Sequence, residues 1–254
     1  MALFDIVIPV GPNDLAVIKD QFSYTNKNVI GFRNVYLIIP DSLKGSINSE
    51  GNVYIILESV FPFSLDTVAS IHGKGSRNGW YLQQLLKFYV WQVVPELMER
   101  YLVLDSDTFF LRPTEFVKSN NEGKMECYYN IGKEKHQPYF THMKKMHPSF
   151  EKIVEESGIC HHMMFEQKYI KEIINIVEDC HQKKFYLVFL EQVSDIGGSG
   201  ASEYELYFNY IIKNHSSDIK IHHLKWGNIT VHPNRIDNDK LDVDYVSYHW
   251  HSRQ

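Results

Sequence analysis

The sequence predicts an α/β fold with a mostly parallel central sheet flanked by helices. Two observations predict it. The first half of the chain alternates apolar runs of strand length with segments of helical periodicity, an order typical of parallel sheets. The composition, 44% hydrophobic and 22% charged over 254 residues, is that of a globular protein with a sizeable core.

Each element of the first half has its own signal. The apolar run 3–10 is expected to form the first strand, and Gly11 and Pro12 stop it. Asn13 or Asp14 can then cap a helix that extends to about residue 22. Residues 34–39, 52–57 and 101–104 are expected as further strands. Residues 80–94 are expected as a helix, because one apolar stripe runs through Leu82, Leu85, Leu86, Tyr89 and Val93.

The second half is less regular. Helices are expected at 150–156, stopped by Gly158, at 167–179, and from Ser202 onward, behind the glycine-rich loop 196–201. Strands are expected at 219–223 and 245–250. With no internal repeat and no linker, the chain is expected to be one domain, 1–254, with functional halves at 1–115 and 116–254.

Charge and cysteine content exclude several classes of protein. The net charge of −5 argues against a protein that grips a nucleic-acid backbone. Three cysteines without a CxxC pair predict neither a disulfide framework nor a thiolate zinc site. The N-terminus has no basic segment of a signal peptide, and no apolar stretch approaches about 18 residues. We therefore expect a soluble, cytoplasmic protein, with membrane attachment only of a peripheral kind.

The strongest chemical signal is an apolar strand that leads into Asp105-Ser106-Asp107, followed by Thr-Phe-Phe-Leu-Arg-Pro. In a parallel sheet ligands gather at the carboxyl ends of the strands, so both carboxylates are expected at a binding crevice. Carboxylate oxygens suit Mg²⁺ or Mn²⁺, which commonly bridge a protein to phosphate groups. The alternative is a solvated turn, because Asp-x-Asp alone is common.

In this context the segment resembles the GT-A class of metal-dependent glycosyltransferases, which share a Rossmann-like nucleotide-diphospho-sugar transferase fold. The motifs Asn78-Gly-Trp-Tyr-Leu-Gln-Gln-Leu-Leu-Lys87 and Ser202-Glu-Tyr-Glu-Leu-Tyr207 sharpen the resemblance to small GT-A-like transferases of bacteria and large DNA viruses. The resemblance implies sugar transfer from a nucleotide-diphosphate donor, with a UDP-sugar favoured, to a glycan or glycoconjugate hydroxyl. A viral member would act in the host cytoplasm. The oligomeric state stays open.

The resemblance also implies roles for residues around the metal, which is expected to be Mn²⁺ or Mg²⁺. Asp107 would be a direct metal ligand, while Asp105 would meet the donor ribose or a metal-bound water. GT-A enzymes often add a C-terminal histidine to the metal, and His249 is the first candidate here, followed by His223. Ser106, between the two acids, is counted with the donor-binding residues.

Further donor contacts are expected at two other segments. The glycine-rich segment 72–79 precedes a helix, whose N-terminus favours anions, and it places Arg77 and, more weakly, Lys74 near the donor phosphates. Gln83 and Gln84 lie off the apolar stripe and either line the donor site or face water. By the resemblance, Pro9, Val10 and Asn13 at the end of the first strand would cradle the base and ribose.

An inverting transfer needs a general base. Ser202-x-x-Glu205 has the spacing of a capping box, which gives Glu205 a structural role and leaves Glu203 free to act as the base, with Glu205 in reserve. The resemblance places His161 and His162 in the sugar or acceptor pocket, with His162 as a hydrogen-bonding residue.

Two other functions remain open from the sequence. A nucleotidyltransferase also uses two acids and Mg²⁺ at a strand end. A non-catalytic module that binds nucleotide sugars would need the same donor contacts without turnover.

Overall fold

The computed structural model describes residues 3–49 and 51–254. Its central sheet contains β1 (Phe4–Pro9), β3 (Phe32–Ile39), β4 (Val53–Leu57), β5 (Arg100–Leu104) and β10 (His162–Glu166). The strand order is β10-β5-β1-β3-β4. β1 pairs parallel with β3 and β5, and β3 pairs parallel with β4, while β10 is antiparallel to β5. The prediction of an α/β fold with a mostly parallel central sheet is therefore confirmed.

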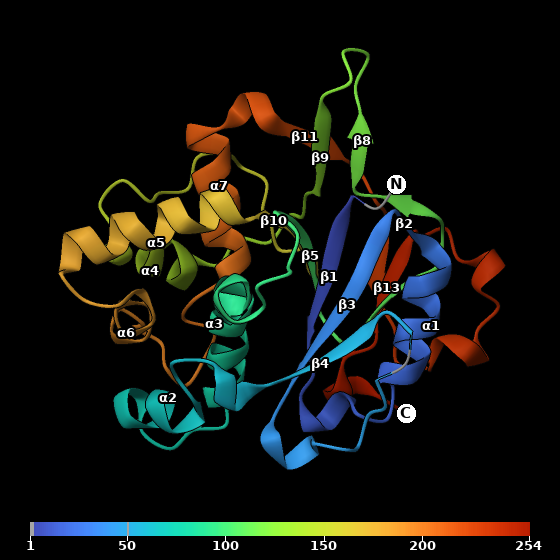
Figure 1. Ribbon diagram of the computed structural model, residues 1–254, viewed down its shortest axis with the longest axis horizontal. Helices are drawn as coiled ribbons and strands as arrows, with labels where there is room; N and C mark the ends of the chain where they lie inside the picture. The colour runs from blue at the N-terminus through green and yellow to red at the C-terminus, as the bar shows by residue number, and fades with distance from the viewer. Residues whose placement is uncertain (1–2, 50) are drawn as a thin grey trace.

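Helices flank this sheet. They are α1 (Ile18–Asn28), α2 (Leu65–His72), α3 (Asn78–Val93), α4 (Gln137–Met146), α5 (Gln167–His181), α6 (Phe185–Glu191) and α7 (Glu203–Asn214). In Figure 1, α2 to α7 lie on one side of the β1–β3–β4 strands and α1 lies on the other. Within the described residues, none of these helices combines the length and apolar content that a bilayer-spanning segment needs.

Three smaller sheets complete the fold. β6 (Thr108–Phe110), β12 (Trp226–Asn228) and β13 (Tyr245–Ser247) form one of them, with the order β12-β13-β6. β8 (Val117–Ser119), β9 (Met125–Asn130) and β11 (Ile219–His222) form the second, and β2 (Val29–Ile30) pairs with β7 (Thr114–Glu115) in the third. The pairing of β13 with β6 brings the C-terminal segment back to the end of β5.

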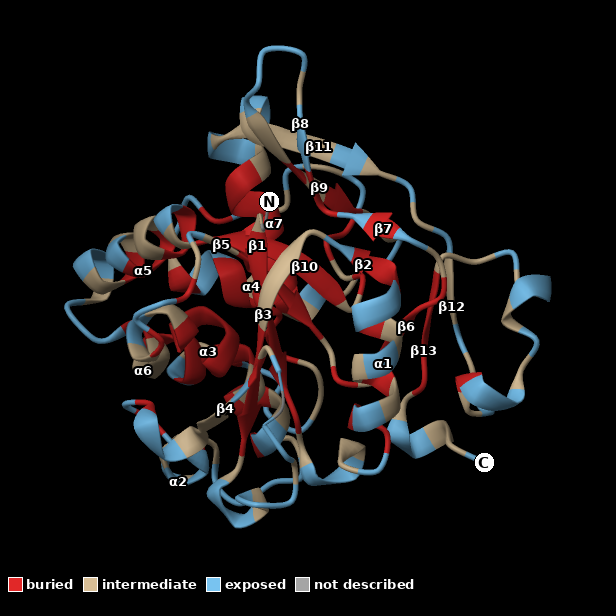
Figure 2. Cartoon of the chain, turned by 45° about the vertical axis from the view of Figure 1, so that its right-hand side comes forward, coloured by how far each residue is buried: buried red, intermediate tan, exposed pale blue. Residues whose placement is uncertain are grey.

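The core explains why the central strands lie where they do. All six residues of β1 are buried, and so are four of the five residues of β5. Figure 2 shows this burial continuing into α3, which has polar as well as apolar side chains facing the interior. Asp5, inside β1, is paired with Arg33 through Nε–Oδ1 and Nη2–Oδ2 contacts of 2.9 and 2.7 Å. A buried charge with a bidentate partner is tolerated in such a strand.

Several sequence expectations about helices are wrong. The first helix begins at Ile18, not behind Asn13 or Asp14, and no side chain caps it. Residues 150–156 form no helix; irregular backbone and a bend lead into an isolated bridge between Gly132 and Ser157. Helices α2, α4 and α6 were not expected. Their short lengths, 8, 10 and 7 residues, give too few turns for a clear apolar stripe.

Candidate functional site

The two acids at the centre of the site follow β5 directly. The Asp105 amide donates to the His161 carbonyl (3.0 Å), and the Thr108 amide donates to the Asp105 carbonyl (3.1 Å), so the turn between β5 and β6 is held on both sides. The side chains of Asp105 and Asp107 keep 23% and 13% of their surface exposed. Both carboxylates are therefore reachable at the carboxyl end of a strand that lies parallel to β1, as the sequence predicts.

His249 lies against the second acid. β13 pairs with β6 so that Ser247 is opposite Thr108, and the next residue, Tyr248, donates its amide to the Asp107 carbonyl (2.8 Å). This register places His249 Nδ1 2.8 Å from Asp107 Oδ2. The hydrogen bond raises the pKa of His249, although burial opposes the rise. The alternative candidate, His223, is exposed.

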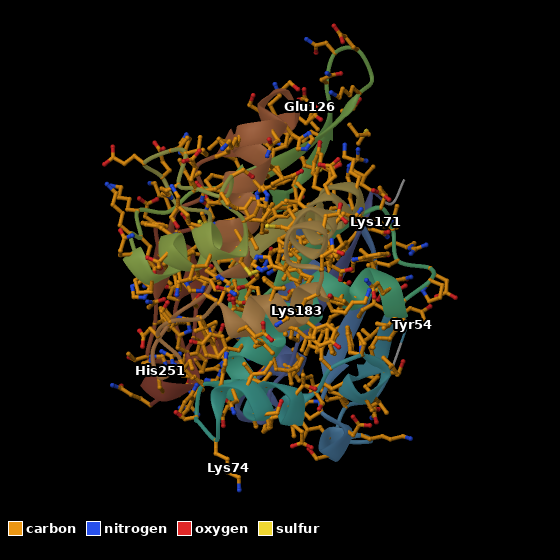
Figure 3. All side chains as sticks on the ribbon, turned by 90° about the vertical axis from the view of Figure 1, so that its left-hand side faces the viewer. Tyr54, Lys74, Glu126, Lys171, Lys183 and His251 are labelled. Carbon is orange, nitrogen blue, oxygen red and sulfur yellow. The ribbon has the colours of Figure 1, made fainter. Side chains whose placement is uncertain are left out.

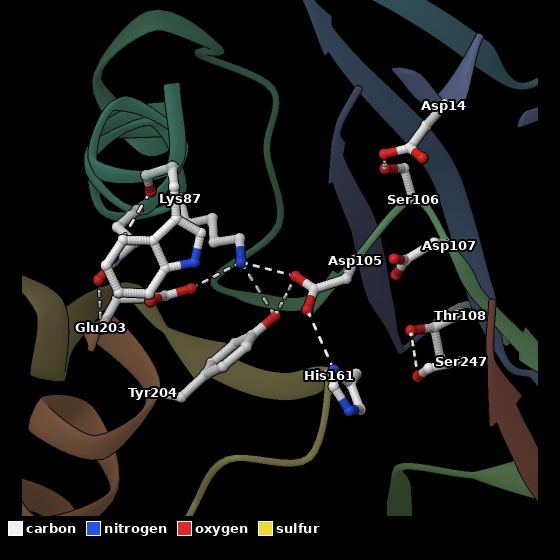
Figure 4. Close-up of polar contacts among 12 residues, drawn as sticks. Asp14, Lys87, Asp105, Ser106, Asp107, Thr108, His161, Glu203, Tyr204 and Ser247 are labelled. Carbon is white, nitrogen blue, oxygen red and sulfur yellow. Dashed lines mark hydrogen bonds and ion pairs between the residues drawn. The ribbon is translucent and has the colours of Figure 1, made fainter. Parts of the chain in front are cut away.

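A buried lysine contacts the first acid. Lys87 Nζ lies 2.7 Å from Asp105 Oδ1 and 2.6 Å from Glu203 Oε1, and it donates to the Tyr204 hydroxyl (3.2 Å) (Figure 4). Tyr204 also donates to Asp105 Oδ1 (2.9 Å). Burial would raise the pKa of Asp105, but the ammonium of Lys87 and the ring of His161 hold it well below its usual value. Asp105 is thus kept charged, with one oxygen occupied by the protein.

The positions of the two glutamates overturn the argument that Glu203 is free to meet substrate. Glu203 is only 4% exposed, and its carboxylate faces Lys87. Ser202 does cap α7 by accepting the Glu205 amide (3.2 Å), as expected. The Glu205 carboxylate, however, contacts Lys152 and accepts from Ser157 Oγ (2.7 Å) instead of completing a capping box. Both carboxylates are therefore engaged in ion pairs inside the protein.

The residues predicted to bind the donor near the start of α3 have different surroundings. Arg77 precedes the helix, donates to Ser199 Oγ (3.2 Å) and lies 5.2 Å from the centre of the Trp80 ring. Lys74 is exposed and points away from the molecule in Figure 3. Gln84 neither faces water nor is accessible to a donor: it is 1% exposed, and its Oε1 accepts the Glu203 amide at the N-terminus of α7 (3.0 Å).

The end of β1 offers little side-chain surface. The side chains of Pro9 and Val10 are buried, and Asn13 is exposed. Gln83, on α3, is half-buried. The Asn13 carbonyl accepts from Arg253 Nη1 (2.6 Å), so the C-terminal segment crosses this strand end.

Four residues near the acids were missed by sequence reasoning. Lys87 and Tyr204 contact Asp105, and the other two are Asp14 and Arg253, whose Oδ1 and Nη2 lie 2.5 Å apart. Ser106, which is 6% exposed, donates to Asp14 Oδ2 (2.6 Å). Burial raises the pKa of Asp14, and the hydrogen bonds from Ser106 and Arg253 oppose the rise. Lys87 had a usable signal, since it is the one charged residue of α3 and interrupts the apolar run 85–91.

The two neighbouring histidines have opposite surroundings. His161 Nδ1 lies 3.7 Å from Asp105 Oδ2, and its ring lies 4.8 Å from Trp226 and 5.1 Å from His249, centre to centre. Its φ of 60° is in the left-handed region, which is costly for a residue with a Cβ. His162 is 2% exposed and packs on Phe110, and burial lowers its pKa well below 6.5. The expectation that His162 hydrogen-bonds in a pocket is therefore wrong.

Polar and charged side chains surround Asp105 and Asp107 at the carboxyl end of β5. Within residues 3–49 and 51–254, no three His, Cys, Asp or Glu side chains are spaced to hold a metal ion by themselves.

The class of protein defined by this fold and site is an α/β protein with paired acids at the end of a parallel strand. The chain belongs to the family described as "Family of unknown function (DUF6492)", which matches residues 26–243. Among solved structures it is similar to the crystal structure of mouse xyloside xylosyltransferase 1 in its apo form, with a TM-score of 0.44, 12% identity and 99% of each chain covered. No curated protein matches the sequence.

Proposed function

We propose that this protein is a GT-A-type glycosyltransferase. It transfers a sugar from a nucleotide-diphosphate donor, with a UDP-sugar favoured, to a hydroxyl of a glycan or glycoconjugate, with the help of Mn²⁺ or Mg²⁺. The observation that carries the proposal is the contact between Asp107 and His249, 2.8 Å long, beside Asp105 at the carboxyl end of β5. The contact joins residues 142 positions apart, and His249 is the histidine that the resemblance selects.

The donor set fits a divalent metal that also binds phosphates. Asp107 offers a carboxylate oxygen, which suits Mn²⁺ or Mg²⁺, and His249 adds an imidazole nitrogen, which is a common ligand of transition metals. Mg²⁺ is commonly held by only one or two carboxylates and completes its shell with water and substrate phosphates. Two protein ligands therefore agree with the lack of a three-residue group among the described residues. When bound, the metal would neutralise charge on the leaving nucleoside diphosphate.

The other side chains would bind and orient the donor. Lys87 holds Oδ1 of Asp105, which leaves Oδ2, on the side of His161, to accept a donor hydroxyl or a water. Arg77, at the start of α3, is placed where a helix N-terminus also favours phosphate. The prediction of inversion requires an accessible Glu203, and that carboxylate is buried on Lys87. We therefore assign Glu203 a positioning role, which it exerts through Lys87. Inversion is tested by NMR of the anomeric configuration of the product.

The proposal is tested by nucleotide binding and by product analysis. In a thermal-shift panel of nucleoside diphosphates and their sugars, at least one ligand should raise the melting temperature only with Mn²⁺ present. Asp107→Asn and His249→Ala should abolish that shift, and His223→Ala, at an exposed histidine, should retain it. A shift that survives both site variants would refute the metal assignment. Release of nucleoside diphosphate supports sugar transfer, whereas release of pyrophosphate would support a nucleotidyltransferase. Donor binding without turnover of any acceptor would indicate a binding module.

A further inference from the structure

A cavity of about 500 Å³ lies between α3, α5 and α6, away from the acids. Small-molecule sites in proteins usually measure roughly 300–1,000 Å³, so this cavity has the size of a binding site. Lys171, on its wall, lies on the side of the molecule opposite His251 in Figure 3. The ring of His251 stacks on that of His249, so the cavity is remote from the Asp107–His249 contact.

The cavity has aromatic walls. Tyr89, Trp91 and Tyr186 line it, and the rings of Tyr89 and Tyr186 meet at 6.1 Å and 73°. The Lys171 ammonium lies 4.7 Å from the centre of the Trp91 ring and donates to Gln167 Oε1 (3.0 Å). Tyr89 is only 3% exposed, so the half-buried rings of Trp91 and Tyr186 are the ones that can pack against the C–H face of a pyranose.

Polar groups surround these rings. Gln92 and Asn175 line the cavity with exposed amide side chains, which both donate and accept hydrogen bonds. Lys184 also lines it, but its ammonium is paired with Glu178 at 3.3 Å. The rim therefore offers donors and acceptors in similar measure, which is what sugar hydroxyls require.

Other small ligands fit this lining less well. A nucleotide would place its phosphates against Lys171 alone, since the charge of Lys184 is already balanced by Glu178. A fatty acyl chain would cover the amides of Gln92 and Asn175 and the Lys171 ammonium without replacing their hydrogen bonds with water.

We propose that this cavity is a second, non-catalytic saccharide site that binds a neutral oligosaccharide. That the bound saccharide is part of the acceptor glycan rests on the proposed function. Saccharide binding itself does not. An acceptor chain held at this site and at the acids together would be present at a high effective concentration near the reacting end.

The test is a titration followed through tryptophan indole NMR signals. The chain has four tryptophans, and a Trp91→Phe variant assigns the Trp91 signal. Malto-, cello-, xylo- and chito-tetraose would be added separately, without Mn²⁺ or nucleotide. At least one should shift the Trp91 signal saturably, and Tyr186→Ala should weaken that binding at least tenfold.

A matched control and a second variant keep the outcome decisive. Tyr54→Ala removes another partly exposed ring, stacked on Tyr36 outside the cavity, and should leave binding unchanged. If Tyr186→Ala does not fold, Lys171→Met should produce the loss instead. No shift with any of the four tetraoses, or equal affinity in the variants, would overturn the proposal. Saccharide binding without Mn²⁺-dependent nucleotide binding would leave this site standing and refute the transferase assignment.

Discussion

Replacement of Lys87 by methionine tests the buried cluster beside the acids. The Lys87 side chain is 1% exposed and contacts two carboxylates, of which Glu203 is 5% and Asp105 23% exposed. Removal of one partner of a buried ion pair costs about 3–5 kcal/mol, because the remaining charge stays buried and unpaired. Water reaches part of Asp105, so we expect the lower end of that range for the free energy of unfolding, about 3 kcal/mol.

The assay is urea unfolding followed by far-UV circular dichroism. Lys118→Met is the matched control, because Lys118 and Glu115 form a pair 3.4 Å apart with both side chains about half exposed, and such pairs contribute less than about 1 kcal/mol. Glu203→Gln should destabilise the natural chain. In the Lys87→Met background it should stabilise instead, because it removes one of the two uncompensated carboxylates. Additive losses in the double variant would refute the reasoning.

Two further predictions concern stability. Burial lowers the pKa of His142 from 6.5 to about 4, so below pH 6.5 the unfolded chain takes up a proton that the folded chain does not. The free energy of unfolding should be highest above pH 6.5 and should fall by up to about 3 kcal/mol as the pH drops to 4. In the His142→Gln variant, the free energy of unfolding should depend less on pH over this range than it does in the natural chain. A Cβ at Gly158 would lie 2.5 Å from Phe208 Cβ, so Gly158→Ala should cost about 1–3 kcal/mol in urea unfolding. Gly79 lies in α3 with open space around it, so Gly79→Ala should raise the free energy of unfolding by up to about 1 kcal/mol. A decrease in this free energy would contradict the helical conformation of Gly79.

Patterns within short segments predicted four of the five strands of the central sheet, whereas β10 was not expected. The apolar runs that became β1, β3, β4 and β5 begin and end within two residues of their predicted bounds. The reason is clearest for β1 and β5, which are buried along almost their whole length and therefore have a nearly continuous apolar sequence. The stripe of α3 and the cap of α7 at Ser202 are local in the same way. The placement of Asp105 and Asp107 followed from the same logic, since they come directly after a buried strand.

Such patterns do not predict contacts between segments that are far apart in the sequence. The amino-acid sequence by itself determined four central strands, helices α3, α5 and α7 and the acids at the end of β5, because backbone periodicity and turn residues act over a few positions. Only the tertiary structure decided that Lys87 faces Glu203 across 116 positions, that His162 is packed while His161 faces Asp105, and that aromatic rings from α3 and α6 line one cavity. These outcomes depend on how helices dock on the sheet, and the docking is set by the summed burial of many side chains rather than by any single motif.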